Sequence, residues 1–577
     1  MGYYLEKAKR DYMIFDVNSI PGSYFVQYPR HRKLISINKV STGQSNAEFN
    51  LRHDWNSVLT HPGDDHLFKD YSKQYFPDAD DMLRYLADYQ KKFDIKVQWN
   101  QKVNKISKSN DSDSYQLTIN NDSGSQYCKY VIIATGLSQE KSLNADWPKQ
   151  PGVHTYGTMP VDPLNYTDQS ILIVGRGNSG LEVAQSLYGH ASYIHLIARS
   201  RLKLSWDTHY VGDVRAINNE VLDSYMLKSL DGLLEVDISL LNFSRCPDGK
   251  YRLELATEAE LQLKVDHVPT RHGYDRIILC MGFKWDDSVM PTPRKQSTMD
   301  KKGKYPKIKE NYESPEFPNL FFAGTITHSL DYGKAAGGFI HGFRYTARAL
   351  SKMLEWRNHQ VPWPTRTTTI SQLPFVILKR ANEGSGIYQM FGVLGDIFIV
   401  DHTTDTVTWL EEYPVALIAD LVNTTGVQVD YKRHSILILL LQYGEDYSRP
   451  GRDTFVLGRA VTDPRSAHTC SFLHPVIRGY RRLPTSSEIE GIKGLPDVLP
   501  KADAIHHIME DFTTSFDGPL AHVQPFRRFI EHFVGQDLRS FKLETCVQFA
   551  LSSPKSVPVN CREYLNSQSN TFSRSDL

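Results

Sequence analysis

The chain has 577 residues, enough for three or four domains of ordinary size. Hydrophobic residues make up 40% and charged residues 23%, which is typical of globular domains with buried cores. Basic and acidic residues number 66 each, so the formal charge is zero and nothing favours a nucleic-acid-binding surface. The longest strictly apolar run, Ile436–Leu441, is far too short to span a membrane.

The first part of the chain alternates strand and helix patterns. Residues 12–15 predict a short buried strand that ends in Asp16. Residues 75–99 predict a helix that begins after a Pro-Asp pair and is followed by a strand. Residues 130–136 predict a buried strand that runs into a small-residue turn. A connection rich in proline and glycine follows.

The next elements repeat the unit of a strand followed by glycine. Residues 171–187 read as a buried strand, a glycine turn and a helix, and a further strand begins at Tyr193. Residues 275–283 and 319–325 each combine a strand with glycine, and the second leads to a helix from about Ala335 to Leu354. Strands that alternate with helices predict parallel sheets in an α/β fold.

From about Pro362 the pattern changes. Isolated β runs are followed by helical patterns at 504–512 and 525–534. These features predict an appended α+β module, with a polar and mobile tail after Ser552.

The glycine turn carries the strongest functional signal. Gly175, Gly177 and Gly180 stand at the G-x-G-x-x-G spacing between a predicted strand and a predicted helix. In such turns the first glycine allows the tight bend, the second lets a pyrophosphate approach the backbone, and the third lets the helix pack on the strand. The phosphates then lie at the helix N-terminus. We therefore predict a dinucleotide site here.

The next strand indicates which dinucleotide fits. NAD sites usually place an acid about 20 residues beyond the glycines. This chain has Arg199 nineteen residues after Gly180, with Arg201 close by. A guanidinium group can bind a phosphate through two hydrogen bonds. The paired arginines therefore favour the 2′-phosphate of NADPH.

A second dinucleotide site is expected from Asp16, which ends a strand where a ribose-binding acid would lie. The glycines that belong to such an acid stand roughly 20 residues earlier, and the chain begins fifteen residues before it. Residues 2–10 are therefore interpreted as the end of a first helix whose strand and glycine turn are missing. Gly175 then belongs to the second dinucleotide turn.

Several motifs resemble known flavoproteins. Residues 75–86, the glycine motif, the paired arginines and the turns at 134–136 and 322–325 resemble two-dinucleotide flavoproteins of the flavin-containing monooxygenase type, over roughly residues 1–355. A narrower likeness, to FAD-dependent oxidoreductase domain-containing proteins of the endoplasmic reticulum, runs nearly end to end. It is carried by residues 28–39, 46–57, 204–219, 334–350 and 504–512.

The resemblance implies two Rossmann-like dinucleotide-binding domains, one for FAD and one for NADP, and a C-terminal α+β module. It divides the chain into a first FAD-binding part at 1–140, an inserted NADP-binding domain at 165–282, a second FAD-binding part at 310–360 and the module at 365–577. The NADPH residues expected are Gly175, Gly177, Asn178, Ser179, Gly180, Arg199 and Arg201. The FAD residues expected are Asp16, Arg32, Asn38, Gly136, Gly324, Asp331 and Gly337. For Arg32, the alternative to a cofactor contact is a solvated position on the surface.

The resemblance also implies a luminal protein of the endoplasmic reticulum. It implies a role in the degradation of misfolded glycoproteins, with lectin, ubiquitin-ligase-adaptor and disulfide-reductase partners. The final residues, Arg574–Leu577, are similar to KDEL-type retrieval signals, although no secretory apolar segment opens the chain. Asn-x-Ser/Thr sequons permit a secretory location and lie at Asn110, Asn121, Asn165, Asn242 and Asn423.

The catalytic residues are not identified by the sequence, and three functions stay open. An NADPH-linked oxidoreductase is the first. A flavin-dependent monooxygenase is disfavoured, because such enzymes usually carry an F-x-G-x-x-x-H-like linker, whereas here His154 follows Gly152 by two residues. A non-catalytic, client-binding adaptor with a flavoprotein fold is the third.

Thiol and metal chemistry have little support in the sequence. No two cysteines lie within three residues of each other, so there is no CxxC motif, and isolated thiols are expected, with a distant disulfide left open. His61 and His66 flank two acids without a further ligand nearby, so no metal site is expected. The cysteines are Cys128, Cys246, Cys280, Cys470, Cys546 and Cys561.

Overall fold

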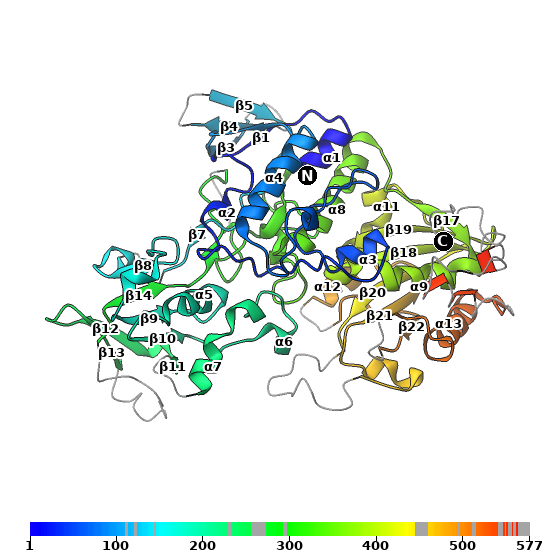
Figure 1. The fold of residues 1–577 in the computed structure, drawn as a ribbon. Coiled ribbons are helices and arrows are strands. Elements are labelled where there is room, and N and C mark those ends of the chain that lie inside the picture. Colours follow the sequence, from blue (N-terminus) through cyan, green and yellow to red (C-terminus); the bar gives the residue numbers. More distant parts are fainter. Residues whose placement is uncertain are drawn as a thin grey trace. The chain divides into compact units, whose positions relative to one another are not determined.

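The structure is a computed structural model, and its chain folds into two compact units (Figure 1). The nucleotide unit comprises residues 2–40 and 54–307, and the C-terminal unit comprises residues 1, 41–53 and 308–577. The structure describes residues 1–109, 114–120, 124–142, 146–227, 232–255, 273–291, 297–444, 460–493, 497–510, 515–539, 546–547, 550–551, 557 and 561–562. The domain ranges expected from the sequence stay predictions.

A five-stranded parallel sheet forms the core of the nucleotide unit. Its order is β11-β10-β9-β14-β8, and every neighbouring pair is parallel. All residues of β9 are buried, as expected for a central strand covered on both faces. Its strands are β8 (Val153–Thr155), β9 (Ser170–Val174), β10 (Tyr193–Ala198), β11 (Gly232–Asp237) and β14 (Arg276–Leu279).

The two faces of β9 belong to two separate hydrophobic clusters, because successive side chains of a strand point to opposite faces. Ile171 and Ile173 pack in one cluster with Leu181 and Ala184 of helix α5 (Asn178–Leu187). The alternate residues of β9 pack in the other cluster, with β11 and β13. Helix α5 therefore packs on the face of the sheet to which Ile171 and Ile173 point.

Smaller elements surround this sheet, and several agree with the sequence. β1 lies at the predicted position, directly before Asp16, although its residues are only partly buried. Helix α4 begins after Pro77 and Asp78, as predicted. The residue ranges are α1 (Gly2–Lys7), β1 (Ile14–Phe15), α2 (Tyr24–Gln27), α4 (Ala79–Lys92), β2 (Val97–Gln98), β3 (Val103–Lys108), β4 (Tyr115–Ile119), β5 (Gly124–Cys128), β6 (Val131–Ile133), β7 (Gln139–Glu140), α6 (Ser205–Thr208), α7 (Val221–Met226), β12 (Leu241–Arg245), β13 (Tyr251–Leu255) and β15 (Phe283–Lys284).

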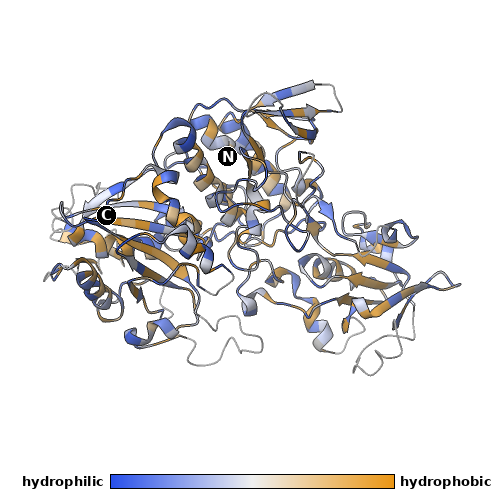
Figure 2. Ribbon diagram, turned by 180° about the vertical axis from the view of Figure 1, so that it is seen from behind, coloured by the Kyte–Doolittle hydropathy of each residue, from blue (hydrophilic) through white to orange (hydrophobic). Residues whose placement is uncertain are grey.

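The C-terminal unit is built on a six-stranded antiparallel sheet in the order β17-β19-β18-β20-β21-β22. One face packs against α9 (Leu373–Glu383) and α13 (Gln524–Val534) in a large hydrophobic cluster. Figure 2 shows the central strands of both sheets as hydrophobic. The strands are β17 (Arg366–Thr369), β18 (Leu394–Asp401), β19 (Thr406–Pro414), β20 (His434–Gln442), β21 (His474–Tyr480) and β22 (Ala504–His507).

The other elements of this unit are short, apart from α8. They are α3 (Ala47–Leu51), β16 (Leu320–Phe322), α8 (Ile340–His359), α10 (Ser385–Gln389), α11 (Leu421–Thr425) and α12 (Ser486–Gly491). The mixed helix and sheet content confirms the α+β module. Within the described ranges of both units, no helix combines the length and the apolar sequence needed to cross a membrane.

Two secondary-structure predictions are wrong in this unit. The predicted helix at 504–512 begins as strand β22, because residues 504–507 pair with β21 in antiparallel register. The helix predicted from about Ala335 begins at Ile340 instead and extends to His359. The start is delayed because the Asp331 carboxylate accepts a hydrogen bond from the Gly337 amide at 2.8 Å and holds this segment in a loop.

The expectation of isolated thiols is also wrong for two cysteines. Cys546 and Cys561 form a disulfide and belong to the large hydrophobic cluster of the C-terminal unit. The two cysteines are 15 positions apart in the sequence, so no local motif predicts the bond. Cys128, Cys246, Cys280 and Cys470 are free thiols. Most of the tail after Ser552, predicted to be mobile, lies outside the described residues.

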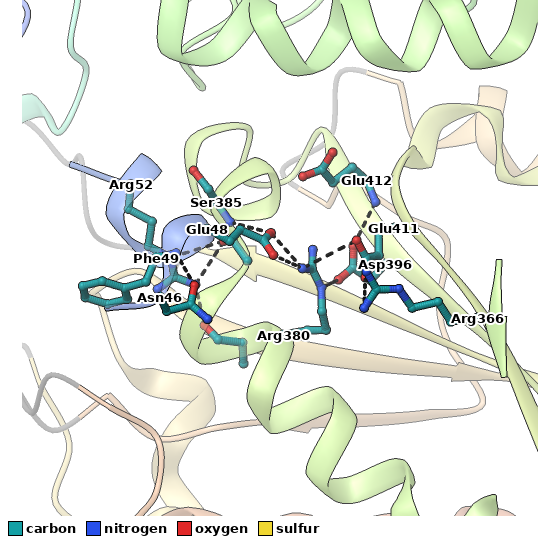
Figure 3. Close-up of polar contacts among 12 residues, drawn as sticks. Asn46, Glu48, Phe49, Arg52, Arg366, Arg380, Ser385, Asp396, Glu411 and Glu412 are labelled. Carbon is teal, nitrogen blue, oxygen red and sulfur yellow. Dashed lines mark hydrogen bonds and ion pairs between the residues drawn. The ribbon is translucent and has the colours of Figure 1, made fainter. Parts of the chain in front are cut away.

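A buried arginine joins three distant segments of the C-terminal unit (Figure 3). The Arg380 Nε on α9 donates to the Asp396 Oδ2 on β18 at 2.6 Å. Its Nη1 donates to both carboxylate oxygens of Glu48 on α3, at 2.7 and 2.6 Å, and lies 3.7 Å from Glu411. Burial raises the pKa of the Asp396 carboxyl, although Arg380 opposes this shift. Arg380 thus attaches segment 41–53 to the central sheet.

Backbone contacts reinforce this attachment. Arg52 donates through Nη2 to the Ala381 carbonyl at 2.8 Å and through Nε to the Gly384 carbonyl at 3.2 Å. Gln389 donates in return to the Arg52 carbonyl at 2.6 Å. Carbonyl groups at the end of α9 that lack partners within the helix are therefore satisfied by a side chain from segment 41–53.

We predict that Arg380→Met destabilises the protein by about 3–5 kcal/mol, because it leaves Asp396 buried without its cation. Urea unfolding followed by circular dichroism measures this change. The double variant Arg380→Met/Asp396→Asn should recover part of the loss. Arg366→Met is the control, since the exposed Arg366 lies 4.0 Å from Glu411 and should contribute less than about 1 kcal/mol. Equal losses in Arg380→Met and Arg366→Met would contradict the prediction.

Candidate functional site

The three glycines of the turn have three different surroundings. A Cβ on Gly175 would clash with the Cys280 carbonyl, and its φ of +126° is open to glycine alone. A Cβ on Gly180 would clash with the Gly175 carbonyl. A Cβ on Gly177 would meet no atom within 4 Å. Two glycines are thus required by packing, and the middle one leaves space for a ligand.

The turn lies at the point where the strand order reverses. β10 flanks β9 on one side and β14 flanks it on the other, so their carboxyl ends share one edge of the sheet. The Gly175 amide donates to the Ile197 carbonyl of β10 at 2.7 Å, and the Cys280 amide donates to the Val174 carbonyl at 2.8 Å. Ligands of open α/β sheets bind at this kind of position.

Helix α5 presents an uncapped N-terminus to the same edge. Its N-cap residue is Gly177, and no side chain caps this end. The first turn of a helix has amide groups without intrahelical partners, and its dipole favours negative charge there. Asn178 and Ser179 stand in this turn, so their amides suit a pyrophosphate held over Gly177.

Asn178 also supports the loop that follows β10, a role that the sequence did not indicate. Its Oδ1 accepts from the Arg215 amide at 2.9 Å and from Asn218 Nδ2 at 3.1 Å, and its Nδ2 donates to the Asp213 carbonyl at 2.9 Å. The Arg215 guanidinium lies 4.6 Å from the centre of the Trp55 ring. The Asn178 side chain is therefore occupied by the protein itself.

Arg199 directly follows β10, and Arg201 stands two positions further on; both are exposed. The end of this strand is the position where the acid of an NAD site would stand. Arg176, in the turn itself, is buried and donates through Nη2 to the Ser200 carbonyl at 2.9 Å. Arg176 thus fixes the backbone between the two exposed arginines. Its place inside the glycine motif was the only signal in the sequence.

A carboxylate on α5 joins the helix to segment 28–32. Glu182 Oε1 accepts from the His31 amide at 2.8 Å and lies 3.1 Å from His31 Nδ1. Its Oε2 accepts from the Tyr156 hydroxyl at 2.6 Å. Burial and the nearby Glu182 raise the pKa of Tyr156, which therefore remains a neutral donor. No local pattern predicts this link, because Glu182 and His31 are 151 positions apart in the sequence.

Four residues expected to bind FAD lie in the nucleotide unit. Asp16 follows β1 and accepts from the Asn18 amide at 2.9 Å. Gly136 has a positive φ of +67° after β6. Arg32 donates through Nη2 to Asp80 Oδ1 at 2.6 Å, so its guanidinium group already pairs with a carboxylate of α4. Asn38 is buried, its Nδ2 donates to the Ser72 carbonyl at 2.8 Å, and its Oδ1 has no partner among the described residues.

The remaining three expected FAD residues lie in the C-terminal unit. Gly324 has a φ of +75° and open space where a Cβ would stand. Both oxygens of the buried Asp331 are occupied, by the Gly337 amide and by His328 Nδ1, each at 2.8 Å. A Cβ on Gly337 would clash with the Asp331 carboxylate. Asp331 and Gly337 therefore shape the loop before α8, and their contact with FAD stays a prediction.

These features decide how well FAD fits. The buried Asn38 Oδ1 without a partner and the open space at Gly324 are compatible with a bound polar group. Asp331 offers no free oxygen. Within the nucleotide unit, Asn38 is thus compatible with FAD, and within the C-terminal unit Gly324 is more so than Asp331.

The chain is similar to several known proteins. Residues 1–324 match the family described as pyridine nucleotide-disulphide oxidoreductase. FAD-dependent oxidoreductase domain-containing protein 2 from Mus musculus is 42% identical, over 98% of this chain and 87% of its own length. The Danio rerio protein of the same name is 41% identical, over 98% and 86%. The structure of a flavin-containing monooxygenase from Stenotrophomonas maltophilia is 18% identical, with a TM-score of 0.44, and the match covers 62% of this chain and 94% of that chain.

Substitutions in the turn separate folding from binding. We predict that Gly177→Ala keeps the melting temperature within a few degrees, because its Cβ meets nothing, but weakens NADPH binding at least about tenfold by crowding the pyrophosphate. Gly175→Ala should instead lower the melting temperature, because of its positive φ and the Cys280 carbonyl. Calorimetric titration with NADPH and thermal melts measure both effects. Unchanged NADPH affinity in Gly177→Ala would exclude this turn as the site.

Proposed function

Because the chain belongs to the pyridine nucleotide-disulphide oxidoreductase family of FAD- and NADP-binding flavoproteins, we propose that it is an NADPH-dependent oxidoreductase of the endoplasmic reticulum lumen. We further propose that it acts in the degradation of misfolded proteins there. The observation that carries the enzymatic part is the position of Arg199. It occupies, directly after β10, the place where an NAD site would have an acid.

Binding of NADPH divides between backbone and side chains. The amides at the start of α5 hold the pyrophosphate over Gly177, and the guanidinium groups of Arg199 and Arg201 bind the 2′-phosphate. Arg176 holds the Ser200 carbonyl and so limits the freedom of the loop that carries them. NADH lacks the 2′-phosphate and should lose the interactions of both exposed arginines.

FAD is held, in this proposal, by Asn38 and Gly136 of the nucleotide unit, and a contact of Gly324 with FAD stays a prediction from the sequence. FAD, when bound, would supply the hydride-accepting ring. The residues of the chain orient the two cofactors. Asn38 presents its free Oδ1 as a hydrogen-bond acceptor, and Glu182 fixes segment 28–32 against α5.

The electron acceptor is proposed to be a molecule outside this chain. Burial raises the pKa of the thiols of Cys128, Cys280 and Cys470, so these cysteines are poor thiolates near neutral pH. An internal thiol relay through these three residues is therefore disfavoured.

A location in the lumen is supported by three features. Disulfides such as Cys546–Cys561 persist in oxidising compartments. The described sequons, at Asn165, Asn242 and Asn423, are exposed and accessible to glycosylation. The last four residues are similar to a retrieval signal.

We predict that NADPH bleaches the flavin absorbance of the FAD-loaded protein under anaerobic conditions, and that NADH does so much more slowly. Arg199→Ala should weaken NADPH binding about 10- to 100-fold and leave NADH unchanged, because one charge-assisted phosphate contact contributes about 1.5–3 kcal/mol. Stopped-flow absorbance measures the rates, and Lys203→Ala is the control. A protein that binds no flavin would favour the adaptor function. Oxygen-dependent NADPH consumption with a small amine or sulfide would favour a monooxygenase.

The location has its own test. With a secretory leader attached, the full chain should be retained in cells, and deletion of Arg574–Leu577 should release it into the medium. Immunoblots of cells and medium, with glycosidase treatment, measure retention and glycosylation. Equal retention of both forms would contradict a retrieval role for these four residues.

A further inference from the structure

The sheet of the C-terminal unit carries a pocket on the face opposite its large hydrophobic cluster. Phe398, Val400 and Val407 point into that cluster. Their neighbours in β18 and β19 point the other way, because successive side chains of a strand alternate between faces. These neighbours line a pocket of about 270 Å³, which is formed by Ile399, Asp401, Thr406, Thr408, Val427, Gln428, Arg433 and His434.

The strand register arranges the floor of the pocket in two rows. Asp401 stands opposite Thr406 on one side and His434 on the other, which gives a polar row across three strands. Ile399 stands opposite Thr408 in the next row. The floor therefore offers fixed polar groups at one end and an aliphatic surface at the other. Segment 427–433 supplies the wall.

The polar row is already satisfied by the protein. Asp401 Oδ1 accepts from the Thr403 amide at 2.9 Å and from its hydroxyl at 2.6 Å. His434 Nδ1 accepts from the Asp430 amide at 2.9 Å, so its Nε2 carries the proton that faces Asp401 Oδ2 at 3.3 Å. Hydrogen bonds from Thr403 and His434 lower the pKa of Asp401, which stays anionic near neutral pH. His434 thus donates to Asp401 through Nε2.

Three other lining residues keep polar groups without partners in the described part of the chain. The Thr408 hydroxyl makes no hydrogen bond there, and Gln428 uses only its Nε2, on the Gly426 carbonyl at 3.2 Å. The Arg433 Nε lies 3.6 Å from Asp401 Oδ2. The terminal amino groups of Arg433 make no hydrogen bond with the described residues. The pocket therefore presents donors and an acceptor that the described part of the fold does not use.

We propose that this pocket binds a neutral polyhydroxylated ring of the size of a single hexose. The lining charges of Asp401 and Arg433 cancel, and the fixed carboxylate of Asp401 disfavours an anion. Vicinal hydroxyl groups both donate and accept, which suits the guanidinium amino groups, the Thr408 hydroxyl and the Gln428 carbonyl. The C–H face of such a ring can lie against Ile399 and Val427. The volume is below the range of about 300–1,000 Å³ typical of drug-sized sites.

Saturation-transfer NMR on the full chain tests the proposal, with the methyl glycosides of glucose, mannose and galactose as probes and inorganic phosphate as a competitor. We expect saturation of at least one glycoside, unaffected by phosphate. Thr408→Val, which keeps the shape and removes the hydroxyl, and Arg433→Met should each lower its affinity at least about fivefold. Lys432→Met, next to the pocket but not lining it, is the matched control.

Three results would overturn the proposal: no transfer to any glycoside, equal transfer in wild type, Thr408→Val and Arg433→Met, or displacement by phosphate. Gln428→Leu provides an independent variant if one of the others lowers the melting temperature. All lining residues belong to the C-terminal unit, and the inference does not depend on NADPH or FAD. Its failure and the failure of the proposed oxidoreductase function are therefore distinguishable.

Discussion

The nucleotide unit depends on the close approach of Gly175 to the carbonyl of Cys280. β9 and β14 are hydrogen-bonded neighbours up to their carboxyl ends, where the Cys280 amide donates to the Val174 carbonyl. The chain that leaves β9 must therefore turn over Cys280 with no room for a Cβ, at a φ that L side chains rarely adopt. Only glycine meets both conditions.

The direction of α5 follows from this turn. Gly180 packs on the Gly175 carbonyl, so the helix starts close to the sheet edge and presents its first amides there. Gly177 is under no such steric limit, and a ligand phosphate is the reason to keep a side chain away from it. In the proposed NADPH site, the backbone recognises the pyrophosphate that all dinucleotides share. The proposal assigns discrimination between NADPH and NADH to the side chains after β10.

Local signals in the sequence were enough to predict the strand, turn and helix around the glycine motif. The glycine spacing and the position of Arg199 both depend on residues less than 30 apart, and the structure places them at the predicted turn and strand end. Contacts between distant segments gave no such signal. Glu182 with His31, Arg380 with Glu48 and the Cys546–Cys561 bond are decided by tertiary packing. The same holds for β22, where pairing with β21 overrides a helical pattern.

Strand β18 shows two ways of placing a carboxylate in a sheet. Asp396 is fully buried, so its charge requires a cationic partner, which is Arg380. Arg380 also binds Glu48, which lies more than 300 residues away in the sequence. Asp401 stands at the end of the strand, where a turn and His434 satisfy it locally. Within the described part of the chain, the Thr408 hydroxyl and the terminal amino groups of Arg433 make no hydrogen bond, although Arg433 Nε lies 3.6 Å from Asp401. A long-range charge cluster thus stabilises one end of the strand, and polar groups at the other end are those of the proposed pocket.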